Sequence, residues 1–153
     1  MRVRSDEDGF SLLEITCAVA IVALLAAIML PIMPRRTSHL QLESYAVEIA
    51  ALLKADRNAA MRHRRDVATK VDVQTRTLRS GAIDRMIHVP DDVSVTFVLA
   101  NTCRGQRSES AIVFLASGIS CGGVITLTRF GSGYEIRVAW LTGGVEIVPQ
   151  HAT

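Results

Sequence analysis

The sequence predicts an α+β protein in which a long N-terminal helix, with its first half in a membrane, packs against an antiparallel β-sheet. Three observations carry this prediction: an apolar run of bilayer length over 10–34, an amphipathic helical pattern over 35–65, and strand-like alternation through 66–153. A chain of 153 residues has room for one membrane segment and one compact domain.

The apolar run begins abruptly at Phe10, after a short stretch of nine mostly polar residues. About 20 apolar residues at 1.5 Å per residue cover the ~30 Å hydrocarbon core of a bilayer. A secretory signal has a shorter apolar core, of about 7 to 15 residues, and ends at a small-residue cleavage site that 31–36 lacks. We therefore expect 10–34 to be the transmembrane half of the helix, kinked near Pro31.

The helical pattern continues in amphipathic form over 35–65. Leu42, Tyr45, Ile49 and Leu52 recur at three- and four-residue intervals with charged residues between them. This half of the helix therefore needs one covered face, and we expect it to pack on the domain that follows.

Period-two alternation replaces the helical pattern after Asp66 and predicts the β-rich domain, 66–153. Breaks at 131–133 and 142–144 have the glycine content of tight hairpin turns. The expected strands are 67–73, 77–79, 93–99, 111–115, 124–130, 134–141 and 145–148.

The junction G-F-S-L-L-E, which covers Gly9 to Glu14 and opens into the apolar run, resembles the type III signal of type IV pilins and pseudopilins. The resemblance implies a pilin-like fold and a leader, 1–9, that a prepilin peptidase removes after Gly9. It also implies that the new N-terminal residue, Phe10, is N-methylated. The proline at position 31 falls where pilin-like helices commonly carry one.

Glu14 is a carboxylate inside the apolar run. An ionised carboxylate within a bilayer costs at least a few kcal/mol and needs a compensating partner. In the resembled family this Glu pairs with the N-terminal amine of a neighbouring subunit, so the resemblance implies that Glu14 is an assembly contact. The alternative is a solvated carboxylate at the membrane interface.

Two segments, 111–147 and 53–60, are similar to the terminal strands and the end of the helix of GspH-type (FimT-like) minor pseudopilins of the type II secretion system. The resemblance implies a structural subunit at or near the pseudopilus tip, which helps to initiate assembly for export of folded proteins. The implied partners are other minor and major pseudopilins and the inner-membrane assembly platform. The implied location is the bacterial inner membrane, with one span and the C-terminal part in the periplasm.

Other classes of function remain open. The main alternative to a secretion pseudopilin is a FimT-like minor pilin of a type IV pilus, acting in pilus biogenesis or DNA uptake. Two further alternatives are a pilin-like protein of another assembly and a secreted enzyme. The basic residues Arg57, Arg62, His63, Arg64 and Arg65 would suit DNA phosphates. Basic residues in the last turn of a helix also complement its dipole, and the net charge of +2 is small, so we expect no nucleic-acid partner.

Cys103 and Cys121 lie in the β-rich domain and are candidates for a disulfide. Such a bond would close a loop of about 18 residues, contribute roughly 3 kcal/mol and require an oxidising compartment such as the periplasm. The alternative is two unpaired thiols. No catalytic or metal-binding motif is present in the sequence, so we expect neither an enzyme nor a cofactor.

Overall fold

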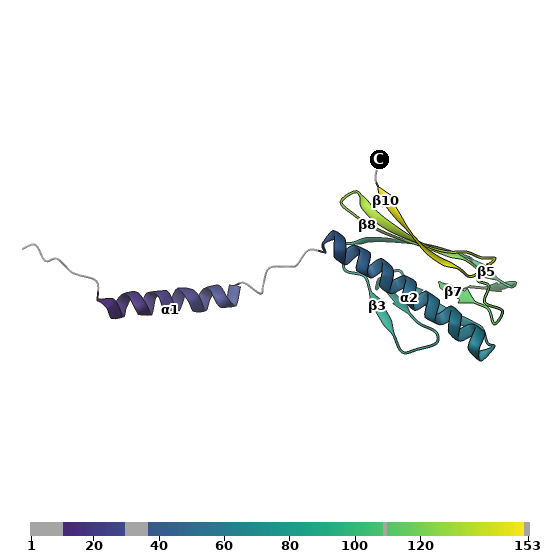
Figure 1. Ribbon diagram of the computed structural model, residues 1–153, viewed down its shortest axis with the longest axis horizontal. Helices are drawn as coiled ribbons and strands as arrows, with labels where there is room; N and C mark the ends of the chain where they lie inside the picture. The colour runs from purple at the N-terminus through teal and green to yellow at the C-terminus, as the bar shows by residue number, and fades with distance from the viewer. Residues whose placement is uncertain (1–10, 30–36, 109, 152–153) are drawn as a thin grey trace, which may run out of the picture. The chain divides into compact units, whose positions relative to one another are not determined.

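The computed structural model describes residues 11–29, 37–108 and 110–151 (Figure 1). The chain divides into two compact units, Met1–Arg36 and Thr37–Thr153. We call the second unit the head.

The described part of the first unit is dominated by helix α1, Leu12–Met29. The helix begins directly after Ser11, whose carbonyl accepts hydrogen bonds from the amides of Glu14 at 2.9 Å and Ile15 at 3.2 Å. From Leu12 to Leu25 its large apolar side chains are exposed, from 54% for Ile15 to 81% for Leu12. Among the residues described, no helix combines the length and the hydropathy needed to cross a membrane.

Helix α2, His39–His63, is the spine of the head. Ser38 caps its N-terminus: the Gln41 amide donates to Ser38 Oγ at 3.3 Å, and the Ser38 amide donates to Gln41 Oε1 at 2.8 Å. Because Ser38 has an extended backbone and this capping box satisfies free amides, a new helix starts at His39. The expectation of one continuous helix through 65 is therefore wrong at this point, and the predicted kink at Pro31 lies outside the described residues.

Within residues 37–108 and 110–151, the head contains two four-stranded antiparallel sheets and a two-stranded ribbon, instead of the single sheet that the alternation predicted. The first sheet has the order β3-β2-β1-β7, the second has the order β10-β9-β8-β4, and the ribbon pairs β5 with β6. The strands are β1 (Val67–Asp72), β2 (Thr77–Arg79), β3 (Met86–His88), β4 (Ser94–Leu99), β5 (Thr102–Cys103), β6 (Gln106–Arg107), β7 (Ala111–Phe114), β8 (Gly123–Arg129), β9 (Ser132–Val138) and β10 (Val145–His151).

The split into two sheets occurs between β7, which pairs with β1, and β8, which pairs with β4 and β9. Gly118 and Gly122 in the connecting segment both have positive φ angles, 86° and 82°. Glycine reaches this left-handed region without the steric penalty of a side chain, so the chain can turn from one sheet to the other here. Alternation identifies a strand and its buried face, but not the strand with which it pairs.

The core lies between the apolar stripe of α2 and the two sheets (Figure 1). From α2 come Leu42, Ile49, Leu52 and Leu53, each at most 1% exposed. The sheets contribute fully buried residues of both layers: Leu78, Ile112, Phe114, Ile125, Leu127 and Ile136. The predicted packing of an amphipathic helix on antiparallel strands is confirmed, and it accounts for the three- and four-residue spacing of the stripe.

Candidate functional site

The first candidate residue, Glu14, lies in the first turn of α1. Its side chain is exposed, and no ion pair is found for it within the described part of the chain. It is the only acidic or basic residue among the 18 of α1. Gly9 and Phe10, the predicted cleavage and methylation positions, lie outside the described residues.

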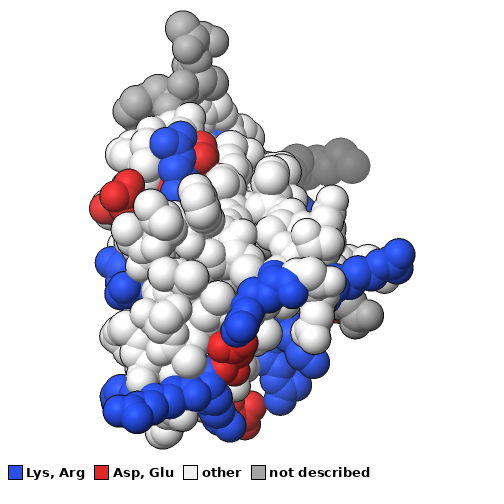
Figure 2. All heavy atoms as spheres, turned by 90° about the vertical axis from the view of Figure 1, so that its right-hand side faces the viewer, with Lys and Arg blue, Asp and Glu red and all other residues white. Residues whose placement is uncertain are grey.

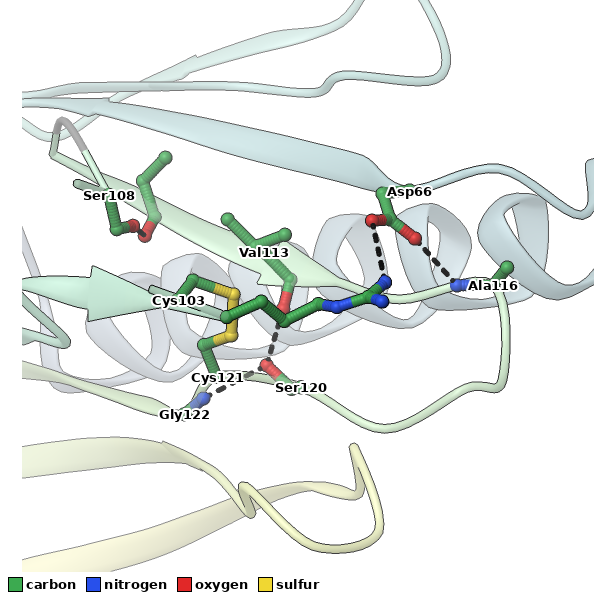
Figure 3. Close-up of a disulfide and its surroundings, with 10 residues drawn as sticks. Asp66, Cys103, Ser108, Val113, Ala116, Ser120, Cys121 and Gly122 are labelled. Atoms are coloured by element: carbon green, nitrogen blue, oxygen red, sulfur yellow. Dashed lines mark hydrogen bonds and ion pairs between the residues drawn. A yellow bond between two sulfur atoms is a disulfide. The ribbon is translucent and has the colours of Figure 1, made fainter. Parts of the chain in front are cut away.

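The structure joins Cys103 and Cys121 in a disulfide, with their Cα atoms 5.6 Å apart (Figure 3). The bond ties β5 to the segment that leads into β8. On one side of it, the Cys121 amide and the Ser120 hydroxyl both donate to the carbonyl of Val113 in β7, at 3.1 and 2.9 Å. Arg104, next to Cys103, forms an exposed ion pair with Asp66, which directly precedes β1; its Nη1 lies 3.8 Å from Asp66 Oδ2.

Asp56 of α2 is fully buried and was not identified from the sequence. Its carboxylate accepts a hydrogen bond from the Thr69 hydroxyl in β1 at 2.6 Å. It also accepts hydrogen bonds from the hydroxyl of Ser80 and, at 3.1 Å, from the amide of Gly81, both just after β2. A buried carboxylate is stable only when its oxygens are satisfied in this way, so Asp56 fixes α2 to the first sheet. Asp56 lies three residues after Leu53 and four after Leu52, so it falls on the apolar stripe of the helix. A carboxylate at such a position could have been identified from the sequence as buried.

Arg57, the next residue, holds α2 to the other side of the head. Its Nε donates to the carbonyl of Gly118 and its Nη2 to that of Thr142, both at 2.9 Å. Gly143, with φ 64°, lies against this contact, and a Cβ there would collide with the Gly118 carbonyl. The β9–β10 turn closes onto the β7–β8 segment at this point. Position 143 of the turn therefore has room for glycine but not for a side chain.

The basic residues in and just after the last turns of α2 fall into two groups by their contacts. Arg57 is occupied by carbonyl oxygens, whereas Arg62, Arg64 and Arg65 are exposed. Figure 2 looks onto this end of the head and shows Lys and Arg side chains along its lower part, with Asp and Glu side chains beside some of them. Arg64 caps the helix in the left-handed conformation, and basic residues in this last turn complement the helix dipole.

No group of three or more His, Cys, Asp or Glu side chains that could hold a metal ion occurs within 11–29, 37–108 and 110–151. The arrangements described above are structural contacts: a capped helix, two anchors on α2 and a covalent link between strands.

No family model matches the sequence. The chain is 29% identical over 147 residues to the type II secretion system protein H of Xanthomonas campestris pv. campestris, covering 96% of this chain and 86% of that protein. It is 30% identical over 135 residues to a fimbrial protein of Pseudomonas aeruginosa, covering 83% of this chain and 82% of that protein.

Solved structures share the fold. The minor pseudopilin EpsH of the Vibrio cholerae type 2 secretion system matches with a TM-score of 0.56 and 14% identity, over 70% of this chain and 95% of that one. The type IV minor pilin FimU of Pseudomonas aeruginosa matches with a TM-score of 0.55 and 16% identity, over 74% and 92% of the two chains. At these identities the likeness establishes the fold alone.

Proposed function

Because the chain belongs to the pilin-like family that includes the type II secretion system protein H and the fimbrial proteins, we propose that it acts as an H-type minor pseudopilin of a type II secretion system. The observation that carries the proposal is the match to the secretion protein H, which extends over nearly the whole chain, from the N-terminal helical segment through the head. As a pseudopilin the chain is a structural subunit and performs no catalysis.

In the proposed mechanism, the segment 10–34 holds the protein in the inner membrane and the head lies in the periplasm. The support comes from α1, which carries one charged residue in 18 and exposes aliphatic side chains from Leu12 to Leu25. The proposed membrane segment is longer than α1 and continues into residues that the structure does not describe. The Cys103–Cys121 disulfide fits an oxidising compartment such as the periplasm.

Assembly starts, in this proposal, when a prepilin peptidase cuts after Gly9 and the new N-terminus, Phe10, is methylated. Glu14 then pairs with the N-terminal amine of a neighbouring pseudopilin. The helical geometry of α1 suits this role because it begins at Leu12, so Glu14 is held on a regular helix close to the cut. A charge pair in the low-dielectric interior of the membrane favours one axial position of the incoming subunit.

The experiment is co-purification of the tagged chain with the other pseudopilins and the prepilin peptidase of the same cell. We expect Glu14→Leu to lower the recovery of partner pseudopilins at least tenfold, since the loss of a pair worth about 1.4 kcal/mol already weakens association tenfold. Glu14→Gln, which keeps the shape and removes the charge, should lower the recovery in the same way.

Two controls keep the result interpretable. Resistance to alkaline extraction shows that the variant remains in the membrane, and intact mass shows whether the chain begins at methylated Phe10. Undiminished recovery of partners by membrane-inserted, processed Glu14→Leu would contradict the assembly mechanism. A chain that still begins at Met1 would remove the basis for the pseudopilin proposal.

A second candidate function, a minor pilin of a type IV pilus, is favoured by the 30% identity to the fimbrial protein and by the shared fold with FimU. The same co-purification separates the two machines. Recovery of pilus subunits in place of secretion pseudopilins would favour the pilus, and the exposed arginines at the end of α2 would then be the residues to test for DNA binding.

A further inference from the structure

The two-residue turn between β8 and β9 presents an aromatic side chain to solvent. Arg129 pairs with Ser132, so the turn consists of Phe130 and Gly131, with φ angles of 46° and 78°. This differs from the predicted turn at 131–133. Such turns favour Asn-Gly or Gly-Gly, because a bulky residue in the left-handed region costs about 1 kcal/mol. The Phe130 side chain is nevertheless 83% exposed, so the head's own core does not explain it.

A short polar network supports the ring. The guanidinium carbon of Arg129 lies 4.5 Å from the centroid of Phe130, within the range of a cation–π interaction. Arg129 itself is only 11% exposed, and its Nη2 lies 3.1 Å from Asp92 Oδ2. Asp92 in turn accepts hydrogen bonds from the amide and the hydroxyl of Thr37, both at 2.8 Å. The turn is therefore connected to the first residue of the head.

This connection shows where on the head the ring lies. Thr37, Ser38 and His39 line one small pocket together with Arg129 and Phe130, so the turn is beside the start of α2. Seven residues, 30–36, separate Thr37 from the last residue of α1. At roughly 3.6 Å per residue, a fully extended connection keeps Thr37 within about 29 Å of that end of α1.

We propose that the Phe130 turn is a bilayer anchor, which places the aromatic ring in the headgroup region of the membrane that holds α1 and so orients the head before assembly. The inference rests on the proposed membrane location of the chain. Phe side chains, like those of Trp and Leu, insert at the boundary between headgroups and acyl chains in proteins that lie on membranes, because this removes their apolar area from water. A strained backbone that exposes an apolar ring is also a recognised sign of a functional contact.

One further feature suits a phospholipid surface. Leu40, in the first turn of α2, is 76% exposed and adds apolar area at the same end of the head. The bilayer is the occupant we favour over a second protein because the covalent connection to α1 itself brings the membrane within reach of the turn.

The chain contains its own control for a test, since Trp140 is its only tryptophan and is 69% exposed. Strand β9 separates Trp140 from the Phe130 turn by about 20 Å, at roughly 3.3 Å per residue. Full-length processed protein is reconstituted into vesicles of phosphatidylethanolamine and phosphatidylglycerol that contain phosphatidylcholine brominated in the upper acyl chain. The test variant, Phe130→Trp with Trp140→Phe, is compared with the wild type.

We expect the tryptophan at position 130 to lose most of its fluorescence to the brominated lipid and to emit at shorter wavelength, while Trp140 of the wild type keeps its intensity. Quenching at neither position would overturn the anchor, and equal quenching at both would show a head with no preferred membrane-facing end, which also overturns it. Alkaline extraction of the same vesicles tests the membrane location separately: retention without quenching at 130 defeats the anchor alone, and release defeats both proposals.

A second measurement covers the case in which the tryptophan variant does not fold. Ser132→Cys in a Cys17→Ser background carries an environment-sensitive fluorophore beside the turn. Its emission should shift to shorter wavelength on reconstitution, and Phe130→Ser should abolish the shift. A shift that survives Phe130→Ser would contradict a role for the ring.

Discussion

At the scale of single residues, Asp56 and Arg57 are neighbours on α2 that hold opposite sides of the head. Asp56 accepts its hydrogen bonds from β1 and the chain after β2, and Arg57 donates to carbonyls of the β7–β8 segment and the β9–β10 turn. Successive residues of a helix point about 100° apart, so one pair of adjacent side chains can reach two sheets. The pair thereby positions the second sheet relative to the first through one helix.

We expect Asp56→Asn to lower the free energy of unfolding by about 2 kcal/mol, because an amide presents a donor where the buried site supplies three donors and needs acceptors. The measurement is urea unfolding of the detergent-solubilised chain, followed by circular dichroism. The control is Asp84→Asn, whose side chain is 95% exposed in a surface pair and should change stability by less than about 0.5 kcal/mol. Equal midpoints for Asp56→Asn and the wild type would show that the buried carboxylate is not needed.

At the scale of elements, sequence periodicity predicted most strands closely, and the structure changed their ends. The predicted strand 77–79 is β2, and 93–99 corresponds to β4 within one residue. The predicted 134–141 ends early, at Val138, because Ala139 donates to Gly144 and accepts from Gly143 within the turn that follows. Strands β3, β5 and β6 were missed. They have two or three residues each, fewer than the four or more over which alternation is a signal, and of these short strands only β2 was predicted.

The disulfide acts on elements that are too short to be stable alone. The ribbon of β5 and β6 has two residues in each strand, and the Cys103–Cys121 bond connects it to the segment before β8. We expect replacement of both cysteines by serine to lower the free energy of unfolding by about 3 kcal/mol, from the entropy of an unfolded chain that lacks an 18-residue loop closure. Urea unfolding measures the change.

The control for this experiment is Cys17→Ser, because Cys17 is free and lies on α1, outside the head. Its unfolding midpoint should match that of the wild type. A reducing agent should reproduce the effect of the double serine variant on the wild-type chain. If reduction leaves the wild-type midpoint unchanged, the bond does not contribute to the stability of the head.

At the scale of the whole molecule, three carboxyl groups of the head have lowered pKa values. Backbone hydrogen bonds lower the pKa of Asp72, through Thr75, and of Asp92, through Thr37. The side-chain hydrogen bond from Arg137 lowers the pKa of Glu135. Each of these carboxyl groups therefore binds its proton less tightly in the folded chain than in the unfolded chain. Above the unfolded pKa values of about 4, the three groups add to the free energy of unfolding. This contribution is lost as the pH falls through the folded pKa values.

We therefore expect the urea midpoint of the head to fall between neutral pH and about pH 3, and to fall less for Asp92→Asn, which lacks one of the three groups. Urea titrations of both proteins across this range measure the difference. If the urea midpoint falls equally with pH in the two proteins, the hydrogen bonds from Thr37 do not favour the ionised form of Asp92.

The sequence by itself determined the class of the protein and the order of its segments. An apolar run with one carboxylate, an amphipathic helix and alternating strands are properties of neighbouring residues, and the junction from Gly9 to Glu14 carried the resemblance to pilin-like proteins. Comparison with known proteins confirmed that resemblance.

Only the tertiary structure decided which strands share a sheet and which side chains meet. Arg57 reaches Thr142 across 85 positions of the chain, and Thr37 reaches Asp92 across 55. Periodicity reports which face of an element is buried but not which distant residue covers it, because that choice depends on packing the whole core at once. For the same reason the exposed ring of Phe130 became evident only when the turn and its support from Arg129 were in place.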